Sequence, residues 1–292
     1  MRRTTRRFGA GALALAFLVG AAGRPARAGI TFYDLLKSMD YIQTGPSAPV
    51  TPVEYDGNAG IASAVGDFTN ASVTSSSPIS PYGMTSFPGG ASWFLGLTTK
   101  AQFDADIPNG TTYTFNVSGG SLGPQSATLT LPATDKYAAN VPYLTGGSYN
   151  ALQGMDASTP LTLTFDPFAA VSGMNFNFMI VNIWPAGHSQ PLINTGLANT
   201  ASSYALAANT LQPNTSYTFG LSYFVDNFML NGGFGQATEE YGYSESTFVN
   251  FTTGPAAVPE PSTAIVAVFG TVAFIAYGWS RHRRDQRRQA AA

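Results

Sequence analysis

Two segments of the chain share a short phrase in which a proline–asparagine turn is followed by alternating large and polar residues. The phrase reads IPNGTTYTFNVSGG at residues 107–120 and LQPNTSYTFGLSYF at residues 211–224. After each turn a large side chain occupies every second position: Tyr113, Phe115 and Val117 in the first, and Tyr217, Phe219, Leu221 and Tyr223 in the second. Period-2 alternation after a turn predicts a half-buried β-strand. The repetition suggests two related sandwich layers or domains.

The composition of the 292-residue chain also favours strands joined by turns. It contains 31 glycines and 19 prolines, and only 10% of its residues are charged. Hydrophobic residues make up 44%, which is ample for a folded core. We therefore predict an all-β chain.

The charges are segregated along the sequence. Every arginine lies at or before Arg27 or at or after Arg281, and residues 29–258 hold fourteen acids and three lysines, so the net charge of this body is −11. Because nucleic-acid binding depends on Lys and Arg, this acidic body argues against a nucleic-acid partner. The chain has no cysteine, which excludes disulfides, thiolate metal sites and a cysteine nucleophile.

The second copy of the repeated phrase resembles the tyrosine corner of fibronectin type III and Ig-like sandwiches. The matching positions of the Leu-x-Pro-x-Thr-x-Tyr phrase are Leu211, Pro213, Thr215 and Tyr217. The resemblance implies a fibronectin III-like β-sandwich over residues 155–254. Its expected strands are LTLTFDP (161–167), MNFNFMIVNIW (174–184), SYALAANTL (203–211) and STFVNFTTG (246–254).

We expect a second β-sandwich over residues 29–131, joined to the first by a linker at residues 132–154. Its expected strands are ASWFLGLTT (91–99), TTYTFNVSG (111–119) and SATLTLPA (126–133). Near its start, Leu35, Leu36 and Met39 share one helical face, which predicts a short helix within residues 31–43.

The N-terminus has the features of a secretory signal peptide, predicted to span residues 1–28. A basic start precedes an apolar run, and the A-x-A pattern of Ala26, Arg27 and Ala28 marks the cleavage site, with Ala26 and Ala28 as its determinants. The apolar run is shorter than the roughly 20 residues that a membrane anchor needs. The secretion machinery is thus a predicted partner, and the body is predicted to be exported.

The C-terminus contains a candidate transmembrane helix at residues 263–279, an uncharged run close to the minimum spanning length. A basic tail at residues 280–292 follows, and positive residues stay on the cytoplasmic side of a membrane. The residues that would fix this orientation are Arg281, Arg283, Arg284, Arg287 and Arg288.

The linker before this helix, residues 255–262, contains the triplet Pro259, Glu260 and Pro261. A Pro-Glu-Pro triplet followed by one apolar helix and an arginine-rich end resembles the PEP-CTERM sorting signal of exported bacterial proteins. The resemblance implies recognition and cleavage by an exosortase-like membrane enzyme. It also implies an inner-membrane-anchored precursor that is later found at the cell surface or in the extracellular matrix.

Residues suited to catalysis are sparse in the exported body. His188 is its one histidine and lies in a Pro- and Gly-containing loop, where a solvated side chain is the expected role. Asp104, Asp106 and Asn109 are weak calcium candidates, since they place oxygen donors together but lack the EF-hand spacing. Residues 239–245 hold three glutamates and predict another acidic loop. No cofactor is expected.

These features favour a non-enzymatic surface or matrix protein of unspecified ligand. The alternative is a secreted carbohydrate-binding module or carbohydrate-active enzyme that uses the acids together with Trp93, Phe94 and Trp184, with extracellular polysaccharide as its partner. A third possibility is a type I membrane protein that stays anchored because no processing occurs.

Overall fold

The computed structural model describes residues 29–230 and 233–255. Strands dominate these residues, as the sequence predicts. The strands are β1 (Ile30–Ile42), β2 (Glu54–Ser63), β3 (Asn70–Thr74), β4 (Tyr82–Gly83), β5 (Thr85–Phe87), β6 (Gly90–Leu97), β7 (Thr112–Ser118), β8 (Gln125–Thr130), β9 (Leu161–Thr164), β10 (Phe176–Pro185), β11 (Ile193–Ala198), β12 (Ser203–Leu206), β13 (Ser216–Leu230) and β14 (Thr238–Thr252). The helices are α1 (Lys100–Asp106), α2 (Ser148–Leu152) and the 3-10 turn η1 (Gly233–Gly235).

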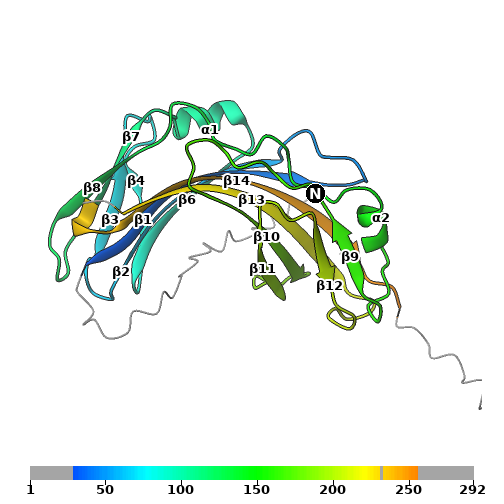
Figure 1. Cartoon of the computed structure of the whole chain (residues 1–292). Helices are drawn as coiled ribbons and strands as arrows, with labels where there is room; N and C mark the ends of the chain where they lie inside the picture. The colour runs from blue at the N-terminus through cyan, green and yellow to red at the C-terminus, as the bar shows by residue number, and fades with distance from the viewer. Residues whose placement is uncertain (1–28, 231–232, 256–292) are drawn as a thin grey trace, which may run out of the picture. The chain divides into compact units, whose positions relative to one another are not determined.

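Eight of the strands form one long sheet in the order β11-β10-β13-β14-β1-β2-β6-β5. Its centre joins the two ends of the described chain, because β1 runs parallel to β14 from Phe32 opposite Thr238 to Ile42 opposite Phe248. Figure 1 shows β14, β13 and β1 as long, curved, adjacent strands. The domain boundaries expected for two separate sandwiches stay a prediction. The long sheet contains strands from both of the expected domains.

The helix predicted within residues 31–43 is wrong, because this segment forms the central strand β1. Both edges of β1 are hydrogen-bonded, one to β14 and the other to β2. Tyr33 and Leu35 point to one face and are fully buried there. Pairing on both edges outweighs the local helical pattern.

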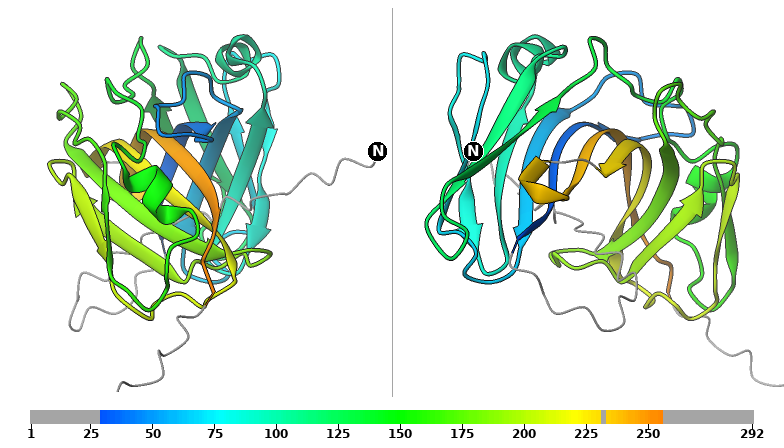
Figure 2. Two further views of the ribbon diagram at one scale, coloured as in Figure 1. Left: turned by 90° about the vertical axis from the view of Figure 1, so that its right-hand side faces the viewer. Right: turned by 60° about the vertical axis from the view of Figure 1, so that its left-hand side comes forward.

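Two hydrophobic cores lie on the same face of the long sheet. One core joins this face to the four-stranded sheet β4-β3-β7-β8 through residues such as Tyr33, Ile61 and Phe115. The other joins it to the pair β12-β9 through residues such as Val181 and Leu163. Both halves are therefore sandwiches that share one layer, and Figure 2 shows the smaller sheets at opposite ends of the long one.

In both repeated phrases a tyrosine hydroxyl bonds to the backbone of the preceding turn. The Tyr113 hydroxyl donates to the carbonyl of Pro108 at 3.0 Å, and the Tyr217 hydroxyl accepts from the Gln212 amide at 2.9 Å. Each tyrosine thus bonds to the backbone five residues upstream and fixes the turn that begins its strand. The strands that follow are β7 and β13, as predicted, although β7 lies in the four-stranded sheet and β13 in the long sheet.

The predicted targeting segments lie outside the described residues. They comprise the cleavage residues Ala26 and Ala28, the triplet Pro259–Glu260–Pro261, the helix at 263–279 and the arginines that follow it. Within residues 29–230 and 233–255, no helix is both long and apolar enough to span a membrane.

Candidate functional site: an acidic sheet face

The face of the long sheet that points away from both cores carries the acids, and we call it the acidic face. Directly opposed residues on paired strands point to the same side. Asp34 lies opposite Glu240 and Gly60, and Gly242 lies opposite Asp226. The acids of this face are Asp34, Asp40, Glu54, Asp56, Asp226 and Glu240. Among the described strand positions of this face, no residue is basic.

Three of these acids, Asp34, Asp226 and Glu240, form a buried group on β1, β13 and β14. Burial, together with the neighbouring carboxylates, raises the pKa of Glu240 to about 9 and that of Asp226 to about 8. Burial raises the pKa of Asp34 to about 7, although a hydrogen bond from the Gly60 backbone acts in the opposite direction. Asp226 is only 2% exposed, and its Oδ1 has no hydrogen-bond partner among the described residues.

Glycines on the neighbouring strands make room for these side chains. A Cβ atom at Gly242 would overlap Asp226 Oδ1, and one at Gly60 would overlap Asp34 Oδ1. Each aspartate therefore lies flat over the adjacent strand, which a side chain at either glycine position would prevent. The sheet surface is shaped to hold carboxylates close to its backbone.

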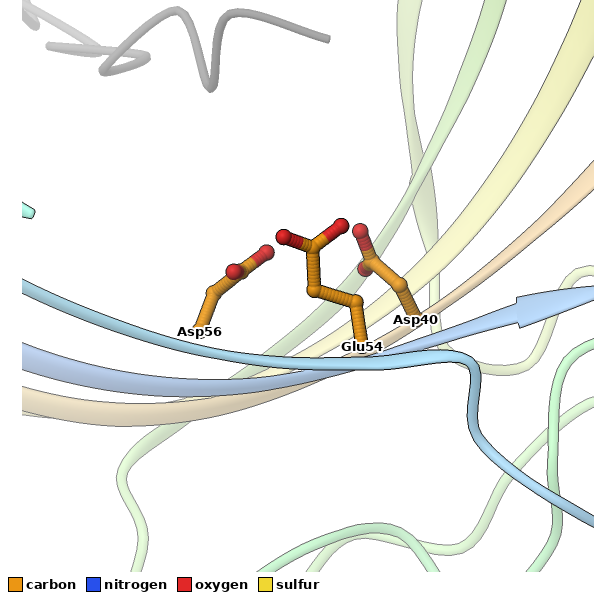
Figure 3. Close-up of side chains that lie close together, drawn as sticks. All are labelled: Asp40, Glu54 and Asp56. Atoms are coloured by element: carbon orange, nitrogen blue, oxygen red, sulfur yellow. The ribbon is translucent and has the colours of Figure 1, made fainter. Parts of the chain in front are cut away.

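The other three acids form a second group on the hairpin of β1 and β2. Carboxylate oxygens of Asp40, Glu54 and Asp56 lie within 4.8 Å of one another, and Figure 3 shows the three side chains on the same side of the sheet. Burial, then the charges of Asp56 and Glu54, raises the pKa of Asp40 well above its usual value. Burial and the charge of Glu54 raise the pKa of Asp56 to about 7.

Aromatic side chains lie on the same face toward β10 and β13. Phe178 stacks on Phe224 at a centroid distance of 4.9 Å, and Phe176 contacts Phe228 at 5.5 Å. Of the predicted sugar-stacking residues, Trp184 lies over Gly220, where a Cβ atom would come within 2.7 Å of its ring. The acidic face thus combines carboxylates with aromatic rings.

The other two predicted sugar-stacking residues lie on opposite sides of β6. Phe94 belongs to the acidic face, opposite Asn58, and is 48% exposed. Trp93 points to the core side instead and contacts Tyr82 at 4.6 Å between ring centroids. Strand alternation therefore leaves Phe94 and Trp184, but not Trp93, available for a ligand at the acidic face.

The predicted calcium candidates lie beside lysines on the core side of the sheet. Lys37 Nζ is 3.6 Å from Asp104 Oδ1 and donates to Asn109 Oδ1 at 3.2 Å. Lys100 also pairs with Asp104, at 2.7 Å. Asp106 is buried and accepts a hydrogen bond from Gln102 Nε2 at 3.0 Å. Asp104 and Asn109 thus act as partners of ammonium groups.

The acidic loop expected near residue 240 is wrong, since Glu239, Glu240 and Glu245 all lie on β14. Pairing with β13 and β1 holds this segment extended on both edges. Alternation sends Glu240 to the acidic face, while Glu239 and Glu245 point to the core side and accept hydrogen bonds from Tyr33 and Tyr41. His188 lies on an exposed turn between β10 and β11.

Five acids of this face could not be identified as site residues from the sequence: Asp34, Asp40, Glu54, Asp56 and Asp226. A signal for two of them was present in EYDGNAGIAS, where polar and small residues occupy every second position of β2. The helical spacing of Leu35, Leu36 and Met39 concealed the two aspartates of β1, because only strand alternation places Asp34 and Asp40 on one face. Asp226 carries no local signal, since its neighbours lie on a distant strand.

No protein-family model matches the sequence, and the comparison with curated proteins finds no match. Among solved structures, the chain is similar to the FN1–FN3 domains of chicken CNTN1, with 13% identity and a TM-score of 0.24. The match covers 67% of this chain and 61% of that chain, so it spans less than two thirds of the neighbour. A likeness this slight supports no conclusion about function.

Proposed function

We propose that this protein is an exported cell-surface or extracellular-matrix protein that acts by binding a ligand at its acidic face. The main support for this proposal is the difference between the two faces of the long sheet. Both hydrophobic cores lie on one face, whereas six acids lie on the other, where no described strand position is basic. A face with one sign of charge concentrates ligands of the opposite sign.

Binding is favoured over catalysis by the chemistry of this face. Its described strand positions include carboxylates, amides, hydroxyls and aromatic rings, and none holds a histidine or lysine that could act beside them. Two open pockets of the described surface contain no acid: one is lined by residues such as Thr112, and the other lies at the end of this face that holds Thr218 and Asn250.

Export and sorting are supported by the sequence of the two ends. The signal peptide would start export, and the tail would hold Pro259, Glu260 and Pro261 at the membrane for an exosortase-like enzyme. Cleavage near this triplet would release the acidic body to the surface or matrix.

Replacing Pro259, Glu260 and Pro261 with alanines is expected to move the body from the matrix fraction to the membrane fraction of the native cells. Immunoblots of the fractions measure the change, and mass spectrometry of the wild-type protein should find no arginine tail. The matched control is Pro255→Ala, in the same linker but outside the triplet, and it should fractionate like the wild type. A mature wild-type protein that retains its arginines would contradict processing and favour a permanently anchored protein.

A carbohydrate-binding module is the second candidate, favoured by Trp184 and Phe94 on the acidic face. Aromatic rings stack on sugar faces, and carboxylates accept hydrogen bonds from sugar hydroxyls. Under this hypothesis Trp184→Ala should weaken binding to polysaccharide from the native matrix about tenfold, equivalent to about 1.4 kcal/mol. Co-sedimentation measures it, with Leu192→Ala on an exposed loop as control. Release of reducing ends would instead favour a carbohydrate-active enzyme.

A further inference from the structure

Asp67 carries a buried carboxylate on the turn between β2 and β3. The residue is 3% exposed, and Phe68 beside it belongs to the core under the four-stranded sheet. Its Oδ2 accepts hydrogen bonds from the Gly29 backbone nitrogen at 2.9 Å and from the Ala64 amide at 3.2 Å, and its Oδ1 accepts one from the Ser121 hydroxyl at 3.1 Å. Both carboxylate oxygens therefore have donors, and all of these donors are neutral.

The backbone around Asp67 holds this carboxylate in place. The Leu122 amide donates to the Asp67 carbonyl at 3.0 Å, and the Ser121 amide donates to the Gly66 carbonyl at 3.1 Å. Gly120 has a φ of +65°, and a Cβ atom there would lie 2.6 Å from the Asp67 carbonyl oxygen, so only a glycine lets the two turns pack this closely. The carboxylate is thus fixed in position by contacts that do not involve its own charge.

No described side chain supplies a positive charge to Asp67. The ion pairs among the described residues are those that Lys37 and Lys100 form with Asp104 and Asp135. Buried carboxylates in proteins are ordinarily paired with a cation, because removing a charge from water is costly. Asp67 therefore has the burial of an ion-pair partner but lacks the cation.

Gly29 is the residue that becomes the N-terminus if the chain is cut at the predicted signal-peptide site. Hydrolysis of the bond between Ala28 and Gly29 by a signal peptidase adds one water, and it leaves a carboxylate on Ala28 and an ammonium group on Gly29. The α-amino group has an ordinary pKa of about 7.7–8.0, so this nitrogen would be charged at pH 7. The nitrogen that gains the charge is the one that lies 2.9 Å from Asp67 Oδ2.

Given the export proposed above, we propose that Asp67 binds the α-ammonium group of Gly29 in the mature protein, and that this pair stabilises the fold once the signal peptide is removed. Hydrogen bonds from charged donors are shorter and about twice as strong as neutral ones. Ile30, the first residue of β1, is 5% exposed and lies in the same core as Phe68, so the pair ties the start of the central strand to the turn after β2. The body reaches its full stability only after cleavage.

The full-length protein in detergent tests this pair, with residues 1–28 replaced by a tag that a site-specific protease removes to leave Gly29 first. Urea denaturation at pH 7 is compared before and after the cut. Cutting should raise the equilibrium constant for folding about tenfold, equivalent to about 1.4 kcal/mol, because an amide donor becomes an ammonium. A second form that keeps Ala28 after the cut should gain less than about threefold, since its ammonium is displaced by one residue from the nitrogen that contacts Asp67.

Two variants separate the charge of Asp67 from its other contacts. Asp67→Asn removes the charge, so cutting should then change the equilibrium constant less than about twofold. Ser121→Ala is the matched control, because it removes a hydrogen bond to Asp67 Oδ1 but keeps the carboxylate. Its cut and uncut forms should lose the same stability, and the tenfold gain should remain. Circular dichroism shows whether each variant is folded, and the form that keeps Ala28 decides the question with an unchanged body if Asp67→Asn does not fold.

Equal stability of the cut and uncut wild-type protein would overturn the pair, as would an equal gain with Gly29 or Ala28 as the first residue. The wild-type gain persisting in folded Asp67→Asn would also overturn it. Mass spectrometry of the protein from its native cells tests the export step separately. A mature protein that begins at Gly29 is expected, and one that begins at another residue would overturn the role of the pair in maturation.

Discussion

Replacement of Lys37 with methionine is expected to lower the free energy of unfolding by about 3 kcal/mol, because it removes one partner of a buried ion pair. Lys37 is fully buried and lies 3.1 Å from Asp135 Oδ1. Its ammonium also donates to the Ile107 carbonyl at 3.2 Å and lies 4.9 Å from the Phe103 ring centroid. Methionine fills a similar volume, but it removes the ammonium from Asp135 Oδ1 and from the Ile107 carbonyl. Urea denaturation at neutral pH measures the loss.

Lys100→Met provides the matched control, because Lys100 pairs with the same Asp135, at 2.9 Å, but is 47% exposed. Surface pairs contribute only about 0–1 kcal/mol, so this variant should lose much less stability. If both variants lost the same amount, burial would not be the source of the effect, and the predicted role of Lys37 would be wrong.

Asp135 shows why the cluster needs its cations. Burial alone would raise the pKa of Asp135, but hydrogen bonds from Asn109, Lys37 and Lys100 and the charge of Lys37 bring it below its usual value. The carboxylate is therefore stabilised in its charged form. Through this cluster, β1 is tied to the residues that follow α1 and β8, so Lys37 connects the long sheet to the layer above it.

The strands that follow proline–asparagine turns could be predicted because their signal is local. Tyr113 and Tyr217 bond to the backbone five residues upstream, so a few neighbouring residues specify each turn. β1 could not be predicted in this way. Its parallel partner β14 lies about 200 residues away in the sequence, and nothing near Leu35 indicates that both edges of the segment will be paired.

The acid groups were hidden for the same reason. Asp226, Glu240 and Asp34 come from three strands, and only the register of those strands brings them together. The glycines opposite them are equally uninformative alone: Gly60 and Gly242 would ordinarily indicate weak strands or bulges. Once the register is known, each glycine has a clear role, since it provides the space into which an aspartate folds.

This burial of carboxylates predicts that the protein is more stable in mild acid than in base. The pKa values of Asp34, Asp226 and Glu240 rise to about 7, 8 and 9 in the folded protein, from ordinary values near 4. Between those values the folded state binds more protons than the unfolded state, so stability falls as the pH rises. The stability that these three protonated carboxyl groups contribute is fully present below about pH 4, and it is lost as the pH rises through their folded-state pKa values of about 7 to 9.

Asp226→Asn should remove much of this pH dependence, because asparagine keeps the shape of the side chain but does not ionise. The variant should unfold at higher urea than the wild type at pH 9 and at nearly the same urea at pH 4.5. A pKa shift from 3.8 to about 8 corresponds to a gain of several kcal/mol at the upper end, at about 1.4 kcal/mol per pH unit.

The control for this prediction is Asp156→Asn, because the pKa of Asp156 is lowered in the folded protein whereas that of Asp226 is raised. Asp156 is exposed, and hydrogen bonds from the Ser158 hydroxyl and amide lower its pKa, so ionisation favours the folded state there. Asp156→Asn should therefore give no gain at pH 9. The measurement is the urea midpoint of both variants and the wild type from pH 4.5 to 9. If the midpoints of Asp226→Asn and the wild type changed in parallel with pH, Asp226 would be ionised without a cost in stability. The charge of the acidic face would then not destabilise the fold.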